Sequence, residues 1–354
     1  MDTAQALLRR VEDATTPADL YGPADGDPAG VRRARRTHRV LALHLHPDRP
    51  AAGLDSARAA AAFAKATALY AAWSRPTGGT GGGDTDDRGE VLVGSRGTHR
   101  LGPLLARGTV ANVYAVPGTD TVVKLVRRPG SNRFVRNERA ALRTLARYAT
   151  GTEAWLAPYV PRLVDTATAA ADEAGGEVLE ANVLGSLGRA DGFVSLAAVR
   201  DAAPDGLDGR DWAWMQRRLL RALAGAHAAG LVHGAVLPEN VLIHPREHGV
   251  VLAGWSFATR PGRRAEGVVR SQAGAYPPEA TDGLVTPATD VAMLGALALT
   301  MLRPGERAQR RFAQGCRQAE PRMRPTAAGL LEEYDDLLER LHGPRRFRPF
   351  DLAV

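Results

Sequence analysis

The chain has 354 residues, 44% of them hydrophobic, which is enough to bury a sizeable core in two or three domains. The formal net charge of +7 permits contact with nucleic acid, but acidic residues are mixed in throughout, so we do not expect a nucleic-acid partner. A single cysteine, Cys316, excludes an internal disulfide framework, and no signal-peptide pattern opens the chain, so we expect a cytoplasmic protein.

The first 75 residues are predicted to form a small helical module. Apolar residues recur at helical spacing from residue 28 to 45 and again from about 56 to 73. The outer face of the first stretch is basic, with Arg32, Arg33, Arg35, Arg36 and Arg39. The two stretches are joined by a short segment that contains His46-Pro47-Asp48. The pattern predicts an antiparallel pair of helices.

This order of basic helix, tripeptide and second helix resembles the J-domain, the DnaJ-like module of co-chaperones. Asp19-Leu20-Tyr21-Gly22 looks like the remnant of the short first helix of that module. In J-domains the basic helix and the tripeptide contact a DnaK-type ATPase chaperone and accelerate its ATP hydrolysis. Carried over to this chain, the contact residues are His46, Pro47, Asp48, Arg35, Arg36 and Arg39. A purely structural alternative exists, because His favours a helix C-terminus, Pro ends a helix and Asp caps the next one.

Residues 76–89 are rich in glycine and carry no apolar anchor, so they predict a flexible linker with an r.m.s. span of roughly 20 Å. Residues 90–343 are predicted to form one larger unit. The tail, 344–354, carries three arginines together with Phe347 and Phe350. We expect the tail to be a frayed end, with a docking peptide as the alternative.

The larger unit begins with motifs that are similar to those of protein kinases. Residues 105–114 resemble the Gly-rich loop, with only Gly108 of its three glycines present. Alanines at two of the glycine positions restrict the approach of backbone amides to phosphate groups. Lys124 stands on a predicted strand where kinases hold the phosphate-binding lysine, and Glu138 matches the helix glutamate that pairs with it. We expect a Lys124–Glu138 pair, which is either structural only or part of a vestigial nucleotide site with Gly108 and Asn240.

The run from residue 233 to 243 resembles the catalytic loop of a kinase, where His-Arg-Asp is followed four residues after the Asp by Asn. Ala235 stands at the position of the base aspartate, and Asn240 matches the asparagine. Gly254-Trp255-Ser256 stands where kinases place Asp-Phe-Gly, and no aspartate occurs from residue 212 to 281. A kinase needs one Asp to orient the hydroxyl nucleophile and another to hold magnesium. The sequence therefore predicts a pseudokinase with no catalytic residue and no metal site.

Several structural marks of the kinase fold follow in the expected order. His233 is expected to be a core histidine that holds the catalytic-type loop. Glu279, in Tyr276-Pro277-Pro278-Glu279, resembles the end of an activation segment and is expected to pair with Arg324, in a motif similar to the late arginine motif of kinases. Asp290 precedes the most apolar stretch, 291–302, which is shorter than the about 20 residues needed to cross a bilayer. We expect a buried helix there and no membrane partner.

Together the resemblances imply an α+β chain: a small all-α J-domain-like helical hairpin (1–75), a linker (76–89), a bilobal kinase-like unit with a β-rich small lobe and a helical large lobe (90–343), and a tail (344–354). The function that they imply is a co-chaperone for a DnaK-type ATPase. Its inactive kinase-like unit would present an unknown client or partner at an effective concentration of the order of millimolar. No cofactor is required, and weak metal-independent ATP binding stays open. The alternatives are a divergent ATP-using phosphotransferase and a nucleotide- or nucleic-acid-binding adaptor.

Overall fold

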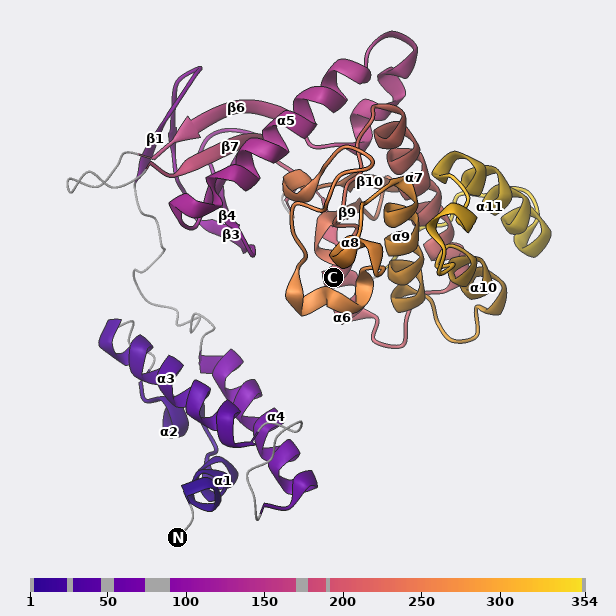
Figure 1. Ribbon diagram of the computed structural model, residues 1–354. Coiled ribbons are helices and arrows are strands. Elements are labelled where there is room, and N and C mark those ends of the chain that lie inside the picture. The colour runs from indigo at the N-terminus through magenta and orange to yellow at the C-terminus, as the bar shows by residue number, and fades with distance from the viewer. Residues whose placement is uncertain are drawn as a thin grey trace. The chain divides into compact units, whose positions relative to one another are not determined.

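The computed structural model describes residues 3–23, 28–45, 54–73, 90–169, 178–188 and 192–351. The chain divides into two compact units, residues 1–83 and 84–354 (Figure 1). The boundary between them falls inside the predicted linker, whose residues lie outside the described ranges. Each unit is therefore described by itself.

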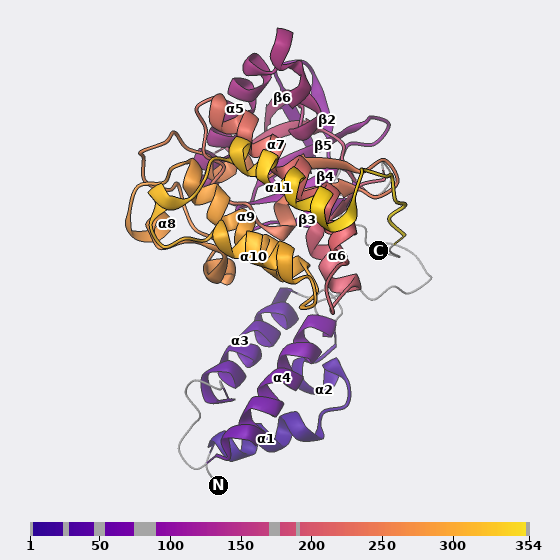
Figure 2. The same ribbon diagram turned by 90° about the vertical axis from the view of Figure 1, so that its right-hand side faces the viewer.

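The first unit is all-helical. Its helices are α1 (Thr3–Asp13), α2 (Pro17–Tyr21), α3 (Pro28–Leu45) and α4 (Ser56–Trp73). The two long helices, α3 and α4, have the bounds that the sequence predicts, and they lie side by side in opposite directions (Figure 2). The short helix α2 covers most of the segment at 19–22. Sequence reasoning did not place α1 as a separate helix.

The core of this unit depends on small residues that let the helices approach one another. Ala62 and Ala66 of α4 are at most 3% exposed and face a cluster that includes Leu41 and Leu45 of α3. The hydroxyl of Tyr21 donates to the carbonyl of Ala66 at 2.9 Å, which fixes α2 against α4. Because the unit is small, such buried hydrogen bonds add usefully to a limited hydrophobic core.

The second unit begins with a seven-stranded antiparallel sheet that forms the small lobe. Its strands are β1 (Val91–Gly94), β2 (Thr98–Arg100), β3 (Leu104–Arg107), β4 (Ala111–Ala115), β5 (Thr121–Val126), β6 (Leu163–Thr168) and β7 (Glu180–Gly185). The spatial order is β2-β1-β6-β7-β5-β4-β3. Helix α5 (Asn132–Tyr148) packs against the central strands β5, β6 and β7 (Figure 1).

The large lobe is mainly helical. Its helices are α6 (Leu196–Ala202), α7 (Gly209–Ala228), α8 (Glu279–Asp282), α9 (Pro287–Met301), α10 (Arg307–Gly315) and α11 (Ala327–His342), and a small sheet contains β8 (Val194–Ser195), β9 (Val241–His244) and β10 (Gly249–Leu252). Helix α9 is apolar around most of its circumference because α7 and α10 both pack on it. The buried helix expected at 291–302 is therefore present. In the described part of the chain, no helix is long and apolar enough to cross a membrane.

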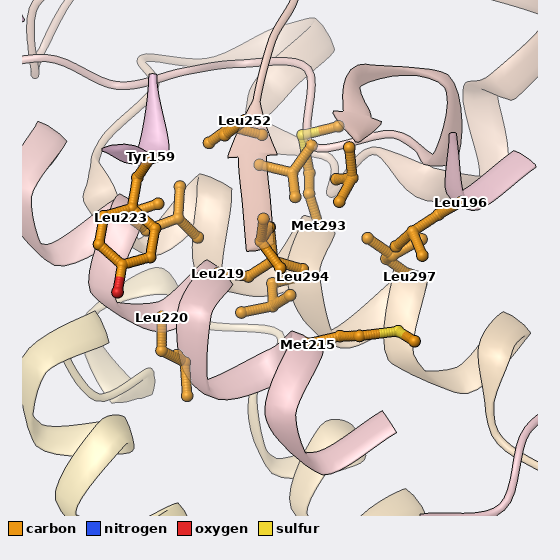
Figure 3. Close-up of a cluster of buried hydrophobic side chains, with 14 of the residues drawn as sticks. Tyr159, Leu196, Met215, Leu219, Leu220, Leu223, Leu252, Met293, Leu294 and Leu297 are labelled. Atoms are coloured by element: carbon orange, nitrogen blue, oxygen red, sulfur yellow. The ribbon is translucent and has the colours of Figure 1, made fainter. Parts of the chain in front are cut away.

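The core of the large lobe joins α7, α9 and β10. Met215 and Leu219 of α7 meet Leu294 and Leu297 of α9, and Leu252 of β10 lies against them (Figure 3). All five side chains are at most 2% exposed. Burial of each such side chain contributes about 1.5–3 kcal/mol, so this core holds the segments that carry the site.

The tail differs from the sequence prediction. Phe350 is 7% exposed and meets the ring of Trp214 on α7, with their centroids 6.1 Å apart. Arg348 forms an ion pair with Asp208 at 3.2 Å. The prediction of a frayed end is thus wrong for residues 344–351, because apolar and charged contacts hold them on the large lobe. Residues 352–354 lie outside the described ranges.

Candidate functional site

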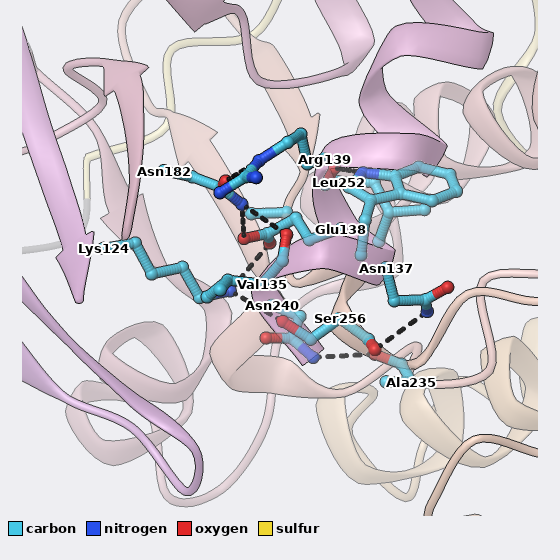
Figure 4. Close-up of polar contacts among 12 residues, drawn as sticks. Lys124, Val135, Asn137, Glu138, Arg139, Asn182, Ala235, Asn240, Leu252 and Ser256 are labelled. Atoms are coloured by element: carbon cyan, nitrogen blue, oxygen red, sulfur yellow. Dashed lines mark hydrogen bonds and ion pairs between the residues drawn. The ribbon is translucent and has the colours of Figure 1, made fainter. Parts of the chain in front are cut away.

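The lysine and glutamate that the sequence pairs meet in the small lobe. Lys124 Nζ on β5 donates to Glu138 Oε1 on α5 at 2.7 Å (Figure 4). The second carboxylate oxygen accepts from Asn182 Nδ2 at 3.2 Å. Asn182 is the residue opposite Lys124 on the neighbouring strand β7. The carboxylate of Glu138 is 1% exposed, so the lysine and the amide together compensate a buried charge.

A third partner of the lysine comes from the large lobe. Ser256 Oγ accepts from Lys124 Nζ at 3.1 Å. The backbone carbonyl of Ser256 also accepts from Asn137 Nδ2 of α5 at 3.0 Å, and the same amide donates to the carbonyl of Ala258 at 2.6 Å (Figure 4). Helix α5 and Lys124 are therefore fixed directly to the segment that stands where kinases place Asp-Phe-Gly. Sequence reasoning missed Ser256 and Asn182, since nothing local marks either as a partner.

In the catalytic-type loop, residues 233–243, apolar side chains stand at the positions that carry the reacting groups in kinases. Ala235, Val236 and Leu237 are 0%, 1% and 2% exposed, respectively, and all belong to the core of the large lobe. A methyl group at position 235 neither accepts a proton nor orients a hydroxyl. The loop ends in a 3₁₀ turn, Pro238–Asn240, where Asn240 Nδ2 donates to the carbonyl of Ala235 at 2.9 Å. Asn240 thus stabilises the loop.

The buried Asp290 holds the start of this loop. Its carboxylate, 0% exposed, accepts from the backbone amides of His233 and Gly234 at 2.7 and 2.8 Å. The third contact is with His227 Nε2 at 3.0 Å. Since helix α9 carries Asp290 at its first turn, the apolar core of the large lobe fixes the position of the loop.

The expected core histidine, His233, is fully buried behind the loop. Its Nδ1 lies 3.2 Å from the backbone amide of Ala235, which donates to it, and its Nε2 lies 2.8 Å from the carbonyl of Ala253. These partners assign a neutral ring with the proton on Nε2. Burial lowers the pKa of His233 below its ordinary value, although the charge of Asp290 acts in the opposite direction. His233 is therefore a structural group that bridges the loop and the segment before Gly254.

Position 254 does not fit an aspartate. Gly254 adopts a left-handed conformation with φ of +79°, which L side chains rarely adopt. A Cβ atom built there would overlap the side-chain amide of Asn240. Position 254 therefore offers no carboxylate to a magnesium ion, because the residue is glycine and the Asn240 side chain fills the space that an aspartate would need.

Gly108 has a local structural role. Its backbone amide donates to the carbonyl of Ala111 at 3.0 Å across the turn between β3 and β4. A Cβ atom at position 108 would lie 2.6 Å from that carbonyl oxygen. The tight turn by itself requires glycine, so Gly108 gives no independent indication of phosphate binding.

The structure also brings Glu279 and Arg324 together. Arg324 Nη2 lies 3.3 Å from Glu279 Oε2, and Nη1 contacts Oε1 of the same carboxylate. The side chain of Arg324 is 1% exposed, and Thr289 Oγ1 donates to Glu279 Oε1 at 3.3 Å. This pair joins α8 to the segment before α11 and to the start of α9.

The predicted chaperone-contact residues of the helical unit are described only in part. His46, Pro47 and Asp48 lie outside the described residues, as do the side chains of Arg35 and Arg39. Arg36 is exposed on α3. The tripeptide follows directly after the last residue of α3, Leu45, which is the order that the sequence analysis expects.

Comparisons with known proteins show the fold alone. No family model matches the sequence, and no curated protein matches it. Among the solved structures that do match, the structure of vaccinia related kinase 3 is 21% identical with a TM-score of 0.57. The match covers 78% of this chain and 97% of that chain. The chain therefore contains a protein-kinase-like fold, with the β-rich and helical lobes described above.

Proposed function

We propose that the chain is a J-domain-type co-chaperone whose kinase-like unit binds a partner and does not transfer phosphate. The observation that carries the absence of phosphate transfer in this proposal is Gly254, which has a left-handed backbone and where an added Cβ would overlap the Asn240 side chain, at the position that holds magnesium in kinases. With Ala235 buried in place of the base, the loop lacks both groups on which phosphoryl transfer depends.

The remaining polar contacts of the kinase-like unit support a scaffold role. Lys124 donates to both Glu138 and Ser256, so its side chain joins the small lobe, α5 and the large lobe. Weak ATP binding through Lys124 would have to compete with these two contacts, and it should not depend on magnesium.

The helical unit supports the co-chaperone part of the proposal. Helices α3 and α4 pack through Leu41, Leu45 and Ala66, and the tripeptide 46–48 begins where α3 ends. Arg36 is exposed on α3, within the basic run of residues 32–39. Such a basic face would steer an acidic surface of a DnaK-type chaperone, and raised salt would weaken this contact, because charges are screened over about 8–10 Å at physiological ionic strength.

The test is the ATPase rate of a DnaK-type chaperone from the same source, measured with and without the full-length protein. We expect stimulation by the wild type and loss of stimulation in His46→Gln. The matched control is His44→Gln, the same substitution two residues earlier on α3, which should retain stimulation. No stimulation by the wild type, or equal losses in the two variants, would contradict the proposal.

A further inference from the structure

A cavity of about 440 Å³ lies in the small lobe, between the C-terminal half of α5 and strand β6. Its floor is apolar and comes from α5, from the segment after it and from β6: Leu142, Ala146, Ala149, Val160 and Leu163. Ala146 is exposed, so the cavity is accessible from solvent at this residue. None of the lining residues belongs to the kinase-type site around Lys124.

Three arginines from different elements line the rim of this cavity. They are Arg96 in the turn between β1 and β2, Arg143 on α5, and Arg162 just before β6. Neither Arg96 nor Arg143 forms an ion pair within the described ranges, and Arg162 has only a 3.4 Å contact with Asp120, in which both side chains are mostly exposed. Such an exposed pair contributes little, so the positive charge of the rim is free to act on a partner.

The turn that carries Arg96 is held in place by a buried acid. Asp165 on β6 is 4% exposed and accepts from the backbone amides of Ser95 and Arg96 at 3.2 and 3.0 Å, and it contacts His99 Nε2 at 2.9 Å. Burial acts to raise the pKa of Asp165, but hydrogen bonds from Ser95, His99 and backbone amides outweigh it and hold the pKa well below its ordinary value. Gly94 is required here, because a Cβ atom would overlap the carboxylate.

We propose that this cavity is a docking site for an acidic segment of a partner protein, in which an apolar side chain enters the cavity and flanking carboxylates meet Arg96, Arg143 and Arg162. The three cations require an anionic partner, and the apolar floor requires an apolar group in that partner. Nucleic acid fits less well, because the lining contains no aromatic ring on which a base could stack. The inference rests on the proposed scaffold function and names the surface that the scaffold uses.

The experiment measures binding of a fluorescein-labelled peptide with one central leucine between two pairs of glutamates, by fluorescence anisotropy with the full-length protein. We expect saturable binding and a loss of about tenfold in affinity for Arg143→Glu and for Arg96→Glu. The charge-matched control is Arg133→Glu on the same helix, which does not line the cavity and lies about 15 Å along the helix from Arg143, beyond the screening length, so it should change affinity by less than about twofold. Equal losses in the Arg143 and Arg133 variants would overturn the proposal.

Further measurements separate the apolar contribution to binding from the charge contribution. A peptide with glycine in place of leucine should bind about tenfold more weakly, and Ala146→Trp, which fills the cavity from an exposed position, should abolish the difference between the peptides. A single-stranded 12-mer oligonucleotide that competes better than the leucine peptide would overturn the proposal in favour of nucleic acid. The assay contains neither ATP nor chaperone, so its failure is distinguishable from failure of the proposed co-chaperone function.

Discussion

Two sets of residues at the kinase-type positions of this unit differ in chemistry. In one set, the buried charges of Glu138 and Asp290 are each compensated by several donors. In the other set, Ala235 and Gly254 occupy the positions of the reacting groups and carry no polar side chain. The comparison indicates that the residues that stabilise a kinase-like fold can be present where the reacting side chains are absent. The carboxylates of Glu138 and Asp290 have their hydrogen-bond partners within the protein, so their role in the fold does not depend on the reaction.

The largest expected effect comes from removing the acid that holds the loop. Asp290→Ala would leave the amides of His233 and Gly234 buried without an acceptor, and we expect it to lower the free energy of unfolding by about 4 kcal/mol. The measurement is urea unfolding followed by tryptophan fluorescence. Asp282→Ala, the same change at an exposed acid, should cost less than about 0.5 kcal/mol. A similar small loss for Asp290→Ala would show that the loop does not depend on it.

The pair in the small lobe gives the next effect. We expect Glu138→Ala to lower the free energy of unfolding by about 3 kcal/mol, because it strips Lys124 and the Asn182 amide of their shared acceptor. Adding Lys124→Met removes the unpaired cation, so the double variant should be more stable than the sum of the two single effects predicts. Strict additivity in urea unfolding would indicate that the two side chains are not coupled.

The reaction side of the comparison can be challenged by restoring an acid. Gly254→Asp should destabilise the protein by about 2 kcal/mol, because the side chain must adopt a left-handed backbone and displace Asn240. Gly262→Asp is the matched control, since Gly262 has a similar φ of +77° and open space around it. The control should therefore cost less in the same unfolding assay. If the two variants lose the same stability, the steric part of the explanation is wrong.

A smaller effect concerns pH. Burial lowers the pKa of His233 in the folded state, so the unfolded chain takes up the proton first as pH falls. The contribution of His233 is therefore present above the unfolded pKa of about 6.5 and is lost as pH falls below it. Because burial also lowers the pKa of His248, the measured quantity is the difference between wild type and His233→Gln. Parallel pH profiles would contradict this role.

The sequence predicts most of the kinase-like fold because its motifs are local and ordered. The pairs Lys124–Glu138 and Glu279–Arg324 could be named because each residue belongs to a short motif with a known place in that fold. The bounds of α3 and α4 followed from helical periodicity and from turn residues on both sides.

What the sequence could not show depends on contacts between residues far apart in the chain. Ser95 and Asp165 are separated by 70 residues, and neither belongs to a motif that predicts the other. Ser256 was visible in the sequence, but its contact with Lys124 requires the two lobes to meet. The docking of Phe350 on Trp214 likewise depends on the surface of α7, which no pattern in the tail reveals.

The central claim is that the kinase-like unit does not transfer phosphate, and the most direct test is calorimetric titration of the full-length protein with ATP, with and without magnesium, beside a radiolabelled autophosphorylation assay. We predict no transfer, and any heat of ATP binding should be unchanged by magnesium, because Gly254 supplies no ligand for the ion. Magnesium-dependent ATP binding, together with phosphate transfer that is lost in Lys124→Ala, would contradict the account.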